Sequence, residues 1–353
     1  WVEAIEEALE QAQAMVVLLS PHAKASTWVR REISYAQGQG RHVFPLLIDG
    51  EQSTAVPLNL SEAHWIDGRR DMHRATLHDL LPAVQRHFGR AVAKPLVSFD
   101  WIEIPAGPFL MGSDKKKDDQ AWDDELPHRP DRQRRAVLPR PAVTLAQFAV
   151  FVKASGYQTD AEKQGQARVW TGKEWKSVKG ANWQHPRGPE SDVRQKQDHP
   201  VTCVTWQDAV AFCAWASEAT DMTIRLPSEA EWEKAARGVD GRLYPWGNNK
   251  PTKEHCNFNM NVGDTTPVGS YPKGASPYGL LDAAGNVWEW TNSLWKGYPY
   301  DPVDGREDSQ SEGNRTVRGG SFDCYVRFVR CACRDNLILP FDSVGLRGVS
   351  PGF

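Results

Sequence analysis

Six cysteines are the side chains of this 353-residue chain that could most readily do chemistry, because a thiolate can act as a nucleophile, a metal ligand or half of a disulfide. None lies in a Cys-x-x-Cys pair of the kind that binds zinc, and the closest two are Cys331 and Cys333. Six cysteines in a chain of this length do not make the disulfide framework of a small secreted domain. We therefore expect reduced thiols in a cytoplasmic protein.

The C-terminal tail, residues 319–353, has an unusual set of residue types. It contains no Lys, Glu, Gln, Met or Trp, although these types make up roughly a fifth to a quarter of the rest of the chain. Framework-like residues alternate in this region with a mixed set. The framework-like residues are Arg318, Gly319, Gly320, Ser321, Arg330, Cys331, Ala332, Arg334, Pro340, Gly345 and Arg347.

The mixed set consists of Phe322, Asp323, Cys324, Tyr325, Arg327, Phe328, Asp335, Asn336, Leu337, Ile338, Leu339, Phe341, Asp342 and Ser343. Each of these types can be encoded by an AAC codon whose adenines are replaced by other bases, and the missing types cannot. The pattern is typical of a surface whose amino acids differ among copies of the gene. It predicts a variable ligand-binding region at about residues 319–347. The alternative is a small pair of C-terminal strands whose composition is accidental.

Length and charge exclude several classes of protein. A chain of 353 residues has two domains as its default expectation. The net charge is only −3, and the basic run Arg132–Arg140 is short and broken by proline, so we expect no nucleic-acid partner. The longest apolar run, Ala14–Leu19, is too short to cross a bilayer, and no signal peptide is visible. We expect no membrane segment in this chain.

The first 89 residues alternate apolar strands with helices. Met15–Leu19 has the composition of a strand buried on both faces, and Val43–Ile48 resembles it. Helical spacing follows each of them, over Trp28–Ala36 and Leu77–Phe88. This alternation predicts an α/β domain with a parallel sheet.

Short segments of this domain resemble the C-terminal half of a TIR domain, which has a flavodoxin-like α/β fold. They are Val16–Pro21, Ser26–Ile33, Phe44–Ile48 and Trp65–Asp67. Some members of that family cleave NAD with the glutamate of a Trp-x-x-x-Glu helix, and Glu32 matches that position. The family's first strand, first helix and nucleotide-closing loop have no counterpart here. The resemblance therefore implies a partial TIR-like domain with a structural or signalling role, with NAD hydrolysis as the alternative.

A linker over residues 90–98 leads to a second domain, residues 99–353. The whole chain has 15 tryptophans, 28 glycines and 24 prolines, which indicates a loop-dominated fold anchored by aromatic side chains. Residues 156–198 are polar and turn-rich, and they predict a long layer of loops. The periodic segments are a strand over Trp101–Ala106 and helices over Val143–Ala154 and Trp206–Ala216, the last with Asp208 on its polar face.

Motifs along this domain carry a specific family resemblance. They are Ile104–Ser113, His199–Trp206, Arg225–Gly238, Tyr244–Gly247, Gly285–Trp290, Arg318–Ser321 and Val344–Arg347. In this order they resemble the formylglycine-generating-enzyme (sulfatase-modifying) domain, which is an α+β variant of the C-type lectin fold. One stretch departs from the family, because residues 126–143 hold arginines and prolines where the family has an alternating strand. We expect that stretch to be distorted or partly disordered.

The same resemblance implies structural Ca²⁺ in the second domain. The family's calcium motif matches the carboxylates of Asp282 and Glu289 with the carbonyls of Gly285 and Val287, and a hard cation prefers such oxygen ligands. A second site is implied at Asn257 and the carbonyl of Phe258, with Asp264 as the nearby acid. The alternative for both sites is a loop held by hydrogen bonds without metal.

Three functions compete for the second domain. Oxidation of a sulfatase cysteine to formylglycine needs a copper-binding cysteine pair in this family. Cys324 matches the first member of that pair and Val329 stands at the second, so we expect no copper. A non-haem iron sulfoxide synthase needs a His-rich site, for which the histidines here show no ligand spacing.

The third function is binding by a variable protein that a diversity-generating retroelement has diversified, a class that uses this lectin-type domain. It accounts for both the missing second cysteine and the type-restricted tail. We expect the framework residues to build the strands and the mixed set to face an unknown protein or small ligand. The chain is then a binding protein and not an enzyme.

Overall fold

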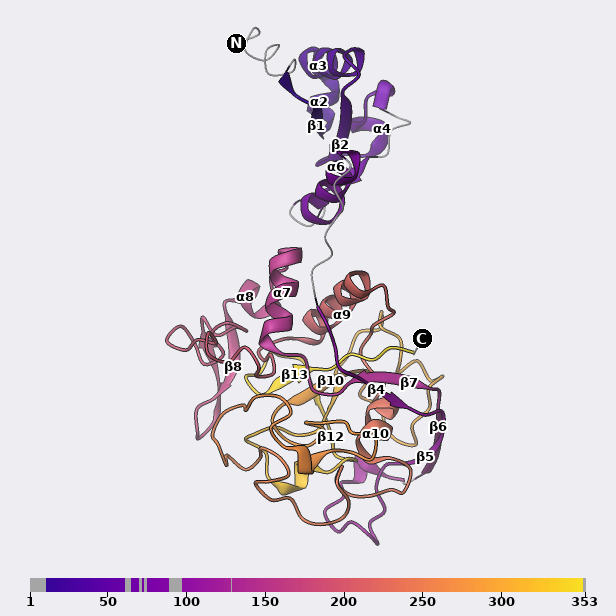
Figure 1. Cartoon of the computed structure of the whole chain (residues 1–353), viewed down its shortest axis with the longest axis vertical. Helices are drawn as coiled ribbons and strands as arrows, with labels where there is room; N and C mark the ends of the chain where they lie inside the picture. The colour runs from indigo at the N-terminus through magenta and orange to yellow at the C-terminus, as the bar shows by residue number, and fades with distance from the viewer. Residues whose placement is uncertain are drawn as a thin grey trace. The chain divides into compact units, whose positions relative to one another are not determined.

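The computed structural model describes residues 11–60, 65–69, 72, 75–88, 97–127 and 129–351. The chain divides into two compact units, the second of which begins at Pro95 (Figure 1). Most of the predicted linker, residues 90–98, lies outside the described ranges, as do the first ten residues. Among the described helices, none combines the length and apolar character needed to cross a bilayer.

A three-stranded parallel sheet with the order β1-β2-β3 forms the centre of the first unit. Helix α3 (Thr27–Gly38) begins after Ser26, whose hydroxyl accepts the backbone N–H of Val29, and it buries Ile33 and Ala36. This arrangement confirms the predicted α/β class. The other elements are β1 (Ala14–Leu19), α2 (Pro21–Ala25), β2 (His42–Leu47), α4 (Gln52–Ala55), η1 (Leu58–Leu60), β3 (Ile66–Asp67), η2 (Ala75–Leu80) and α6 (Leu81–His87).

The prediction that the first strand is buried on both faces is wrong. Val17 and Leu19 are buried, but Val16 and Leu18 are 45% and 49% exposed. Among the described strands, β1 pairs only with β2 and therefore lies at the edge of the sheet. Its alternate side chains point to opposite faces, and only one of these faces is covered.

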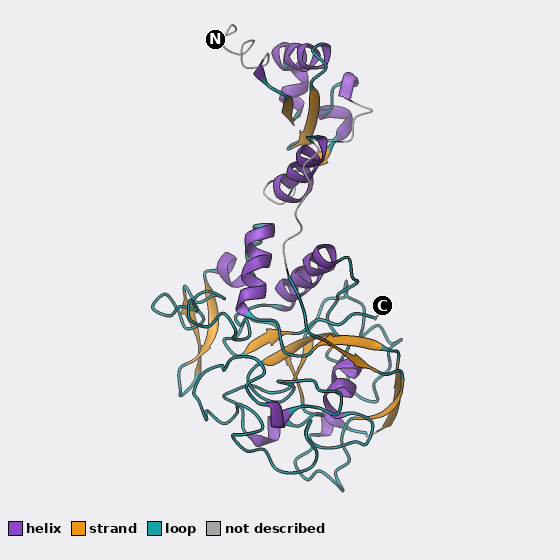
Figure 2. Ribbon diagram, in the orientation of Figure 1, coloured by secondary structure: helices purple, strands orange, loops and turns teal. Residues whose placement is uncertain are grey.

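A four-stranded sheet with the order β12-β11-β10-β13 forms the centre of the second unit. Its neighbours are antiparallel, except that β13 runs parallel to β10. Loops make up most of the remaining chain, as Figure 2 shows. The strands are β10 (Trp288–Leu294), β11 (Arg315–Arg318), β12 (Arg334–Leu337) and β13 (Val344–Leu346). The C-terminal tail thus supplies both outer strands of the sheet.

Three two-stranded ribbons accompany this sheet, and they pair β4 with β7, β5 with β6 and β8 with β9. Their bounds are β4 (Trp101–Ile104), β5 (Gly107–Met111), β6 (Arg129–Gln133), β7 (Ala136–Pro139), β8 (Gln166–Trp170) and β9 (Trp175–Lys179). Strands β6 and β7 occupy the stretch 126–143, so the prediction of a distorted segment there is wrong. The backbone of this stretch pairs with β5 and β4, and such partners override a poor local pattern.

The helices of the second unit are α7 (Leu145–Ser155), α8 (Asp160–Gln164), α9 (Trp206–Thr220) and α10 (Glu229–Arg237), with short turns η3 (Asp123–Glu125), η4 (Pro272–Gly274) and η5 (Val326–Val329). Helix α8 and the β8–β9 ribbon lie within residues 156–198, where only loops were expected. At the start of α9, Asp208 accepts the backbone N–H of Thr205 at 2.8 Å and is fully buried. Its predicted place on a polar face is wrong, because it belongs to a capping box.

Aromatic and apolar side chains fill the core, as the composition predicted. Phe148 of α7 stacks on Phe212 of α9 with ring centroids 5.8 Å apart. Trp232 of α10 is fully buried in a cluster that includes Ile102 of β4 and Leu138 of β7. The core therefore joins the helices to the ribbons and leaves the loops to carry the surface.

Candidate functional site

The predicted framework positions of the tail are all buried, and their arginines form ion pairs. Arg330 donates to the two carboxylate oxygens of Glu125 at 2.6 and 2.7 Å, and to Asp118 at 2.6 Å. Arg334 makes a similar bidentate pair with Glu229, at 2.6 and 2.8 Å. Both oxygens of each glutamate therefore have a partner, which buried charges require.

Arg318 and Arg347 are also paired with buried glutamates. Arg347 donates to both oxygens of Glu289, at 2.6 and 2.9 Å. Arg318 donates to Glu233 and also to the carbonyl oxygen of Ala332 at 2.7 Å. These contacts fix the tail to elements earlier in the chain, and they hold the intervening loops in place.

The mixed, type-restricted side chains fall into two groups by burial. Phe322, Asp342 and Ser343 are only 1%, 4% and 2% exposed, so their predicted place on a ligand-binding surface is wrong. Their backbones are bonded to fixed segments, for example Phe322 N to the carbonyl of Asn286 at 3.0 Å, and this draws their side chains inward. The others, which we call the variable face, are half-buried or exposed: Asp323, Cys324, Tyr325, Arg327, Phe328, Asp335, Asn336, Leu337, Ile338, Leu339 and Phe341.

The first segment of the variable face, residues 323–328, packs against the charged loop 115–124, which was not predicted to contribute to the site. The guanidinium of Arg327 lies 3.2 Å from the ring centroid of Trp122 and donates to the carbonyl of Gln120 at 2.8 Å. Phe328 lies 6.3 Å from the same ring, and Tyr325 is 70% exposed. A lone tryptophan within the charged loop 115–124 was the signal that could have identified this contact.

The second segment of the variable face, residues 335–341, packs against the β8–β9 ribbon. Arg168 N donates to the carbonyl of Pro340 at 2.8 Å. The ring of Trp175 lies edge-on to Phe341 with centroids 5.0 Å apart. Ile338 and Leu339 remain 66% and 44% exposed. The ribbon therefore adds a fixed aromatic border to the variable residues.

A buried carboxylate lies directly behind this second segment. Asp342 Oδ1 accepts the backbone N–H of Trp170 at 3.3 Å, whereas Oδ2 is buried without a hydrogen-bond partner. Burial raises the pKa of Asp342 to about 7. Burial also raises the pKa values of Asp323 and Asp335 on the variable face. Desolvation thus weakens the negative charge of this region.

The cysteine pair required for copper oxidation is incomplete. Cys324 Sγ lies 3.2 Å from the hydroxyl of Ser321, and burial, with the neighbouring Asp323, raises the pKa of this thiol to about 12. Val329 occupies the second position and is fully buried. Cys333 interacts electrostatically with Cys324, but burial raises its pKa well above the ordinary value. Neither thiol is poised to become a thiolate, which is the form that binds copper.

The predicted first calcium motif has one free oxygen. Asp282 Oδ2 accepts the N–H of Gly269 at 2.7 Å, whereas Oδ1 is buried without a partner. Glu289 is engaged by Arg347 and by the indole N–H of Trp232 at 2.7 Å. An unpaired oxygen beside the turn that contains Gly285 and Val287 fits a cation, although Glu289 already has its charge compensated.

The second predicted calcium site fits less well. Asn257 Oδ1 is buried without a partner, but the carbonyl of Phe258 accepts the N–H of Asn261 at 3.0 Å. The nearby acid, Asp264, is bound by Lys196 Nζ at 2.6 Å, so a lysine already supplies the positive charge. Within the described ranges, no three His, Cys, Asp or Glu side chains converge as metal ligands.

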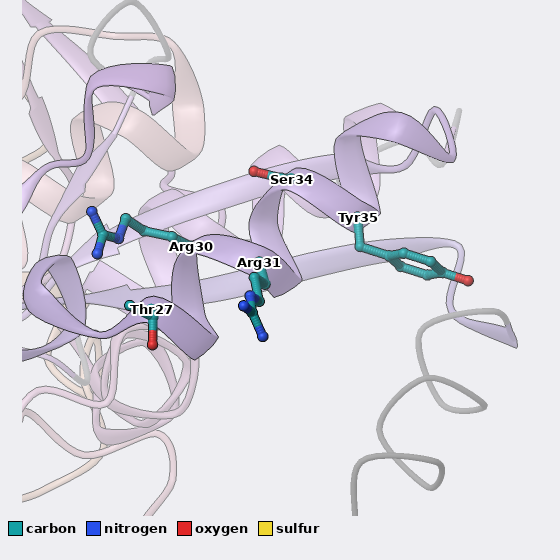
Figure 3. Close-up of a pocket in the computed structure, with 5 residues that line it drawn as sticks. All are labelled: Thr27, Arg30, Arg31, Ser34 and Tyr35. Carbon is teal, nitrogen blue, oxygen red and sulfur yellow. The ribbon is translucent and has the colours of Figure 1, made fainter.

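In the first unit, Glu32 lies half-buried on α3. The same helix borders a cavity of about 560 Å³, which Figure 3 shows with its lining residues Thr27, Arg30, Arg31, Ser34 and Tyr35. Glu32 does not line this cavity. The hollow presents guanidinium and hydroxyl groups, so it does not build a pocket around the predicted acid.

The short core sheet, the accompanying helices and the abundant loops together define a C-type-lectin-type fold. Residues 91–350 match the sulfatase-modifying factor enzyme 1-like domain, and the chain belongs to this family. Residues 1–81 match the TIR domain. Both matches confirm the resemblances drawn from the motifs.

Known relatives include both active and inactive proteins. The chain is 35% identical over 310 residues to the formylglycine-generating enzyme of Mus musculus. This match covers 74% of this chain and 79% of that protein. It is 36% identical over 226 residues to the inactive C-alpha-formylglycine-generating enzyme 2 of the same organism, over 55% and 69% of the two chains. Treponema denticola variable protein 1 shares the fold, with a TM-score of 0.53 and 20% identity over 73% of this chain and 97% of that one.

Proposed function

We propose that this protein is a ligand-binding protein whose C-terminal surface is diversified by a retroelement. The observation that carries the proposal is the division of the tail by burial. Every framework position is buried, whereas the type-restricted positions other than Phe322, Asp342 and Ser343 reach the surface. A catalytic pocket would not produce such a division, because its reactive residues are held by a fixed shell.

The binding partner is a protein or a small ligand, and the composition of the variable face suits this role. Aromatic, Arg and short polar side chains offer large contact areas at a low cost in conformational entropy. The structural likeness to a variable protein supports the same interpretation at the level of the fold.

In this proposal the protein is neither an oxidase nor an NAD hydrolase. The oxidase needs two thiolates, and Val329 replaces one of them. NAD cleavage needs a closed pocket around Glu32, and the cavity on α3 is lined by other residues. The TIR-like unit is instead proposed to have a structural or signalling role.

A structural Ca²⁺ is proposed at Asp282, with the carbonyl oxygens of Gly285 and Val287. The cation would supply the missing partner of Asp282 Oδ1. We propose no copper.

Sequencing of the genomic locus tests the proposed function. We expect a nearby template repeat that matches the codons of residues 319–347 but carries AAC at the type-restricted positions, together with a reverse transcriptase gene. A locus without such a repeat, or a repeat that differs mainly at the framework positions, would overturn the proposal.

A further inference from the structure

A fixed loop, residues 257–264, lies beside the first segment of the variable face and is held at both ends. Asn257 is fully buried, and its Nδ2 donates to the carbonyl of Asp264 at 2.8 Å. The Asp264 carboxylate is bound by Lys196 at 2.6 Å, and Arg187 donates to the carbonyl of Gly263 at 2.7 Å. The loop is therefore rigidly placed before any ligand arrives.

The corner of this loop has a strained backbone. Asn259 and Met260 have φ angles of 52° and 56°, a left-handed conformation that Asn adopts readily but that costs a residue such as Met about 1–3 kcal/mol. Their N–H groups donate to the carbonyls of Cys324 and Phe322, both at 2.8 Å. The strained corner is thus bonded directly to the type-restricted segment, and these bonds hold it against relaxation.

The strained loop exposes apolar side chains. Met260 is 41% exposed and Val262 is 56% exposed. Neither Met260 nor Val262 belongs to the type-restricted set. Apolar side chains exposed on a rigid loop offer contacts that lose little entropy on binding, because the loop is ordered in advance.

We propose that Met260 and Val262 are constant contacts of the variable face, and that the partner they fit is the apolar surface patch of a folded protein. This inference rests on the proposed function. The charges at the end of the loop are already in ion pairs, between Asp264 and both Lys196 and Arg187. The loop therefore favours an uncharged partner surface.

Neither of the two cavities described in the structure is lined by a type-restricted residue. One, of about 560 Å³, lies on α3, and the other, of about 620 Å³, is lined by α7 and residues 183–197. An exposed apolar surface built from two loops instead matches a protein interface, which combines aromatic residues and Met with a shortage of charge.

The test is a display library of the full chain in which the codons of the variable face are randomised and Met260 and Val262 are kept. The library is selected separately on lysozyme, ubiquitin and carbonic anhydrase, and on an immobilised dinitrophenyl hapten. Met260→Ser and Val262→Ser are then made in each selected binder. Val239→Ser is the matched control, because Val239 is 58% exposed and its turn packs on Pro277.

We expect each loop substitution to weaken binding to every protein target by about fivefold or more, a loss typical of an apolar interface contact, and Val239→Ser to change it less than twofold. Melting temperatures should match the parent for all three variants. If the selected binders keep their affinity after both loop substitutions, Met260 and Val262 are not constant contacts, and the proposed function is unaffected. Selection that succeeds only on the hapten would overturn the protein partner, and selection that fails on every target would count against the proposed function itself.

Discussion

Arg330 and Glu125 form a buried bidentate ion pair although 205 residues separate them in the sequence. The arginine is 1% exposed and the glutamate is fully buried. The pair connects the tail between β11 and β12 to the loop that carries Trp122. It therefore sets the position of one whole border of the variable face.

Replacing Arg330 by Met should destabilise the protein by about 3–5 kcal/mol, because it leaves Glu125 and Asp118 as buried carboxylates without a cation. Chemical denaturation of the full chain measures this change. Lys115→Met is the control, since the Lys115–Asp123 pair is 54% and 88% exposed and should contribute less than about 1 kcal/mol. Equal effects of the two substitutions would contradict the role of Arg330.

Substitutions within the type-restricted set should separate by burial. Phe322→Ala should cost about 3–5 kcal/mol, because it opens a cavity in the core. Tyr325→Ala and Ile338→Ala should change the free energy of unfolding by less than about 0.5 kcal/mol, because both side chains are largely exposed. Thermal or urea unfolding distinguishes these values, and a stable Phe322→Ala variant would refute the assignment.

Asp342 should make stability depend on pH. Its folded pKa of about 7 lies above the ordinary value of 3.8, so its favourable contribution is complete below pH 3.8 and is lost as the pH rises through 7. Asp342→Asn, which replaces the carboxylate by a neutral amide of the same shape, should raise the free energy of unfolding at pH 8 by up to about 4 kcal/mol. At pH 3.5 the two proteins should be nearly equal. A difference of the same size at both pH values would exclude titration of Asp342 as the cause.

Calcium should raise the melting temperature of the metal-free protein, because a ligand that binds only the folded state stabilises it by about 2.7 kcal/mol at 100 times its dissociation constant. Excess chelator should reverse the increase. Asp282→Asn should abolish the response, whereas Asp264→Asn should retain it, since Lys196 already binds Asp264. A melting temperature that changes with neither Ca²⁺ nor chelator would contradict the proposed calcium site.

Neither enzymatic alternative should give turnover. Mass spectrometry of a sulfatase-type peptide incubated with the protein and copper should show no formylglycine, because Cys324 has a raised pKa and Val329 stands at the second position. Nicotinamide release from NAD should equal the blank. Sustained formylglycine formation that is lost in both Cys324→Ser and Cys333→Ser would restore the oxidase and identify Cys333 as the second thiol.

Sequence reasoning predicted those features that depend on short motifs or local periodicity. The spacing over Trp28–Ala36 predicted α3, and the strand predicted over Trp101–Ala106 corresponds to β4. Asp208 was misplaced although its signal was local, since Thr205 and Asp208 have the spacing of a capping box.

The errors that remain have non-local causes. Strands β6 and β7 form because β5 and β4 pair with them, and no pattern within residues 126–143 reveals those partners. Phe322 alternates with framework residues like its exposed neighbours, but a backbone bond to Asn286 turns it inward. The contact between Arg327 and Trp122 likewise joins residues 205 positions apart and cannot be read from either segment alone.

The two partners of most buried ion pairs are encoded in different parts of the gene. In the pairs of Arg318, Arg330, Arg334 and Arg347 the arginine lies in the tail or directly before it and the carboxylate comes from an earlier segment, whereas the buried Arg237–Glu233 pair lies within α10. Arginine has codons without adenine, whereas every Asp and Glu codon contains one. Under replacement of adenines, arginine is therefore the member of an ion pair that the rewritten segment can keep unchanged. Under the proposed diversification, the tail would keep its arginine anchors, and variation would fall on exposed side chains such as Tyr325 and Ile338 and also on the buried Phe322, Asp342 and Ser343.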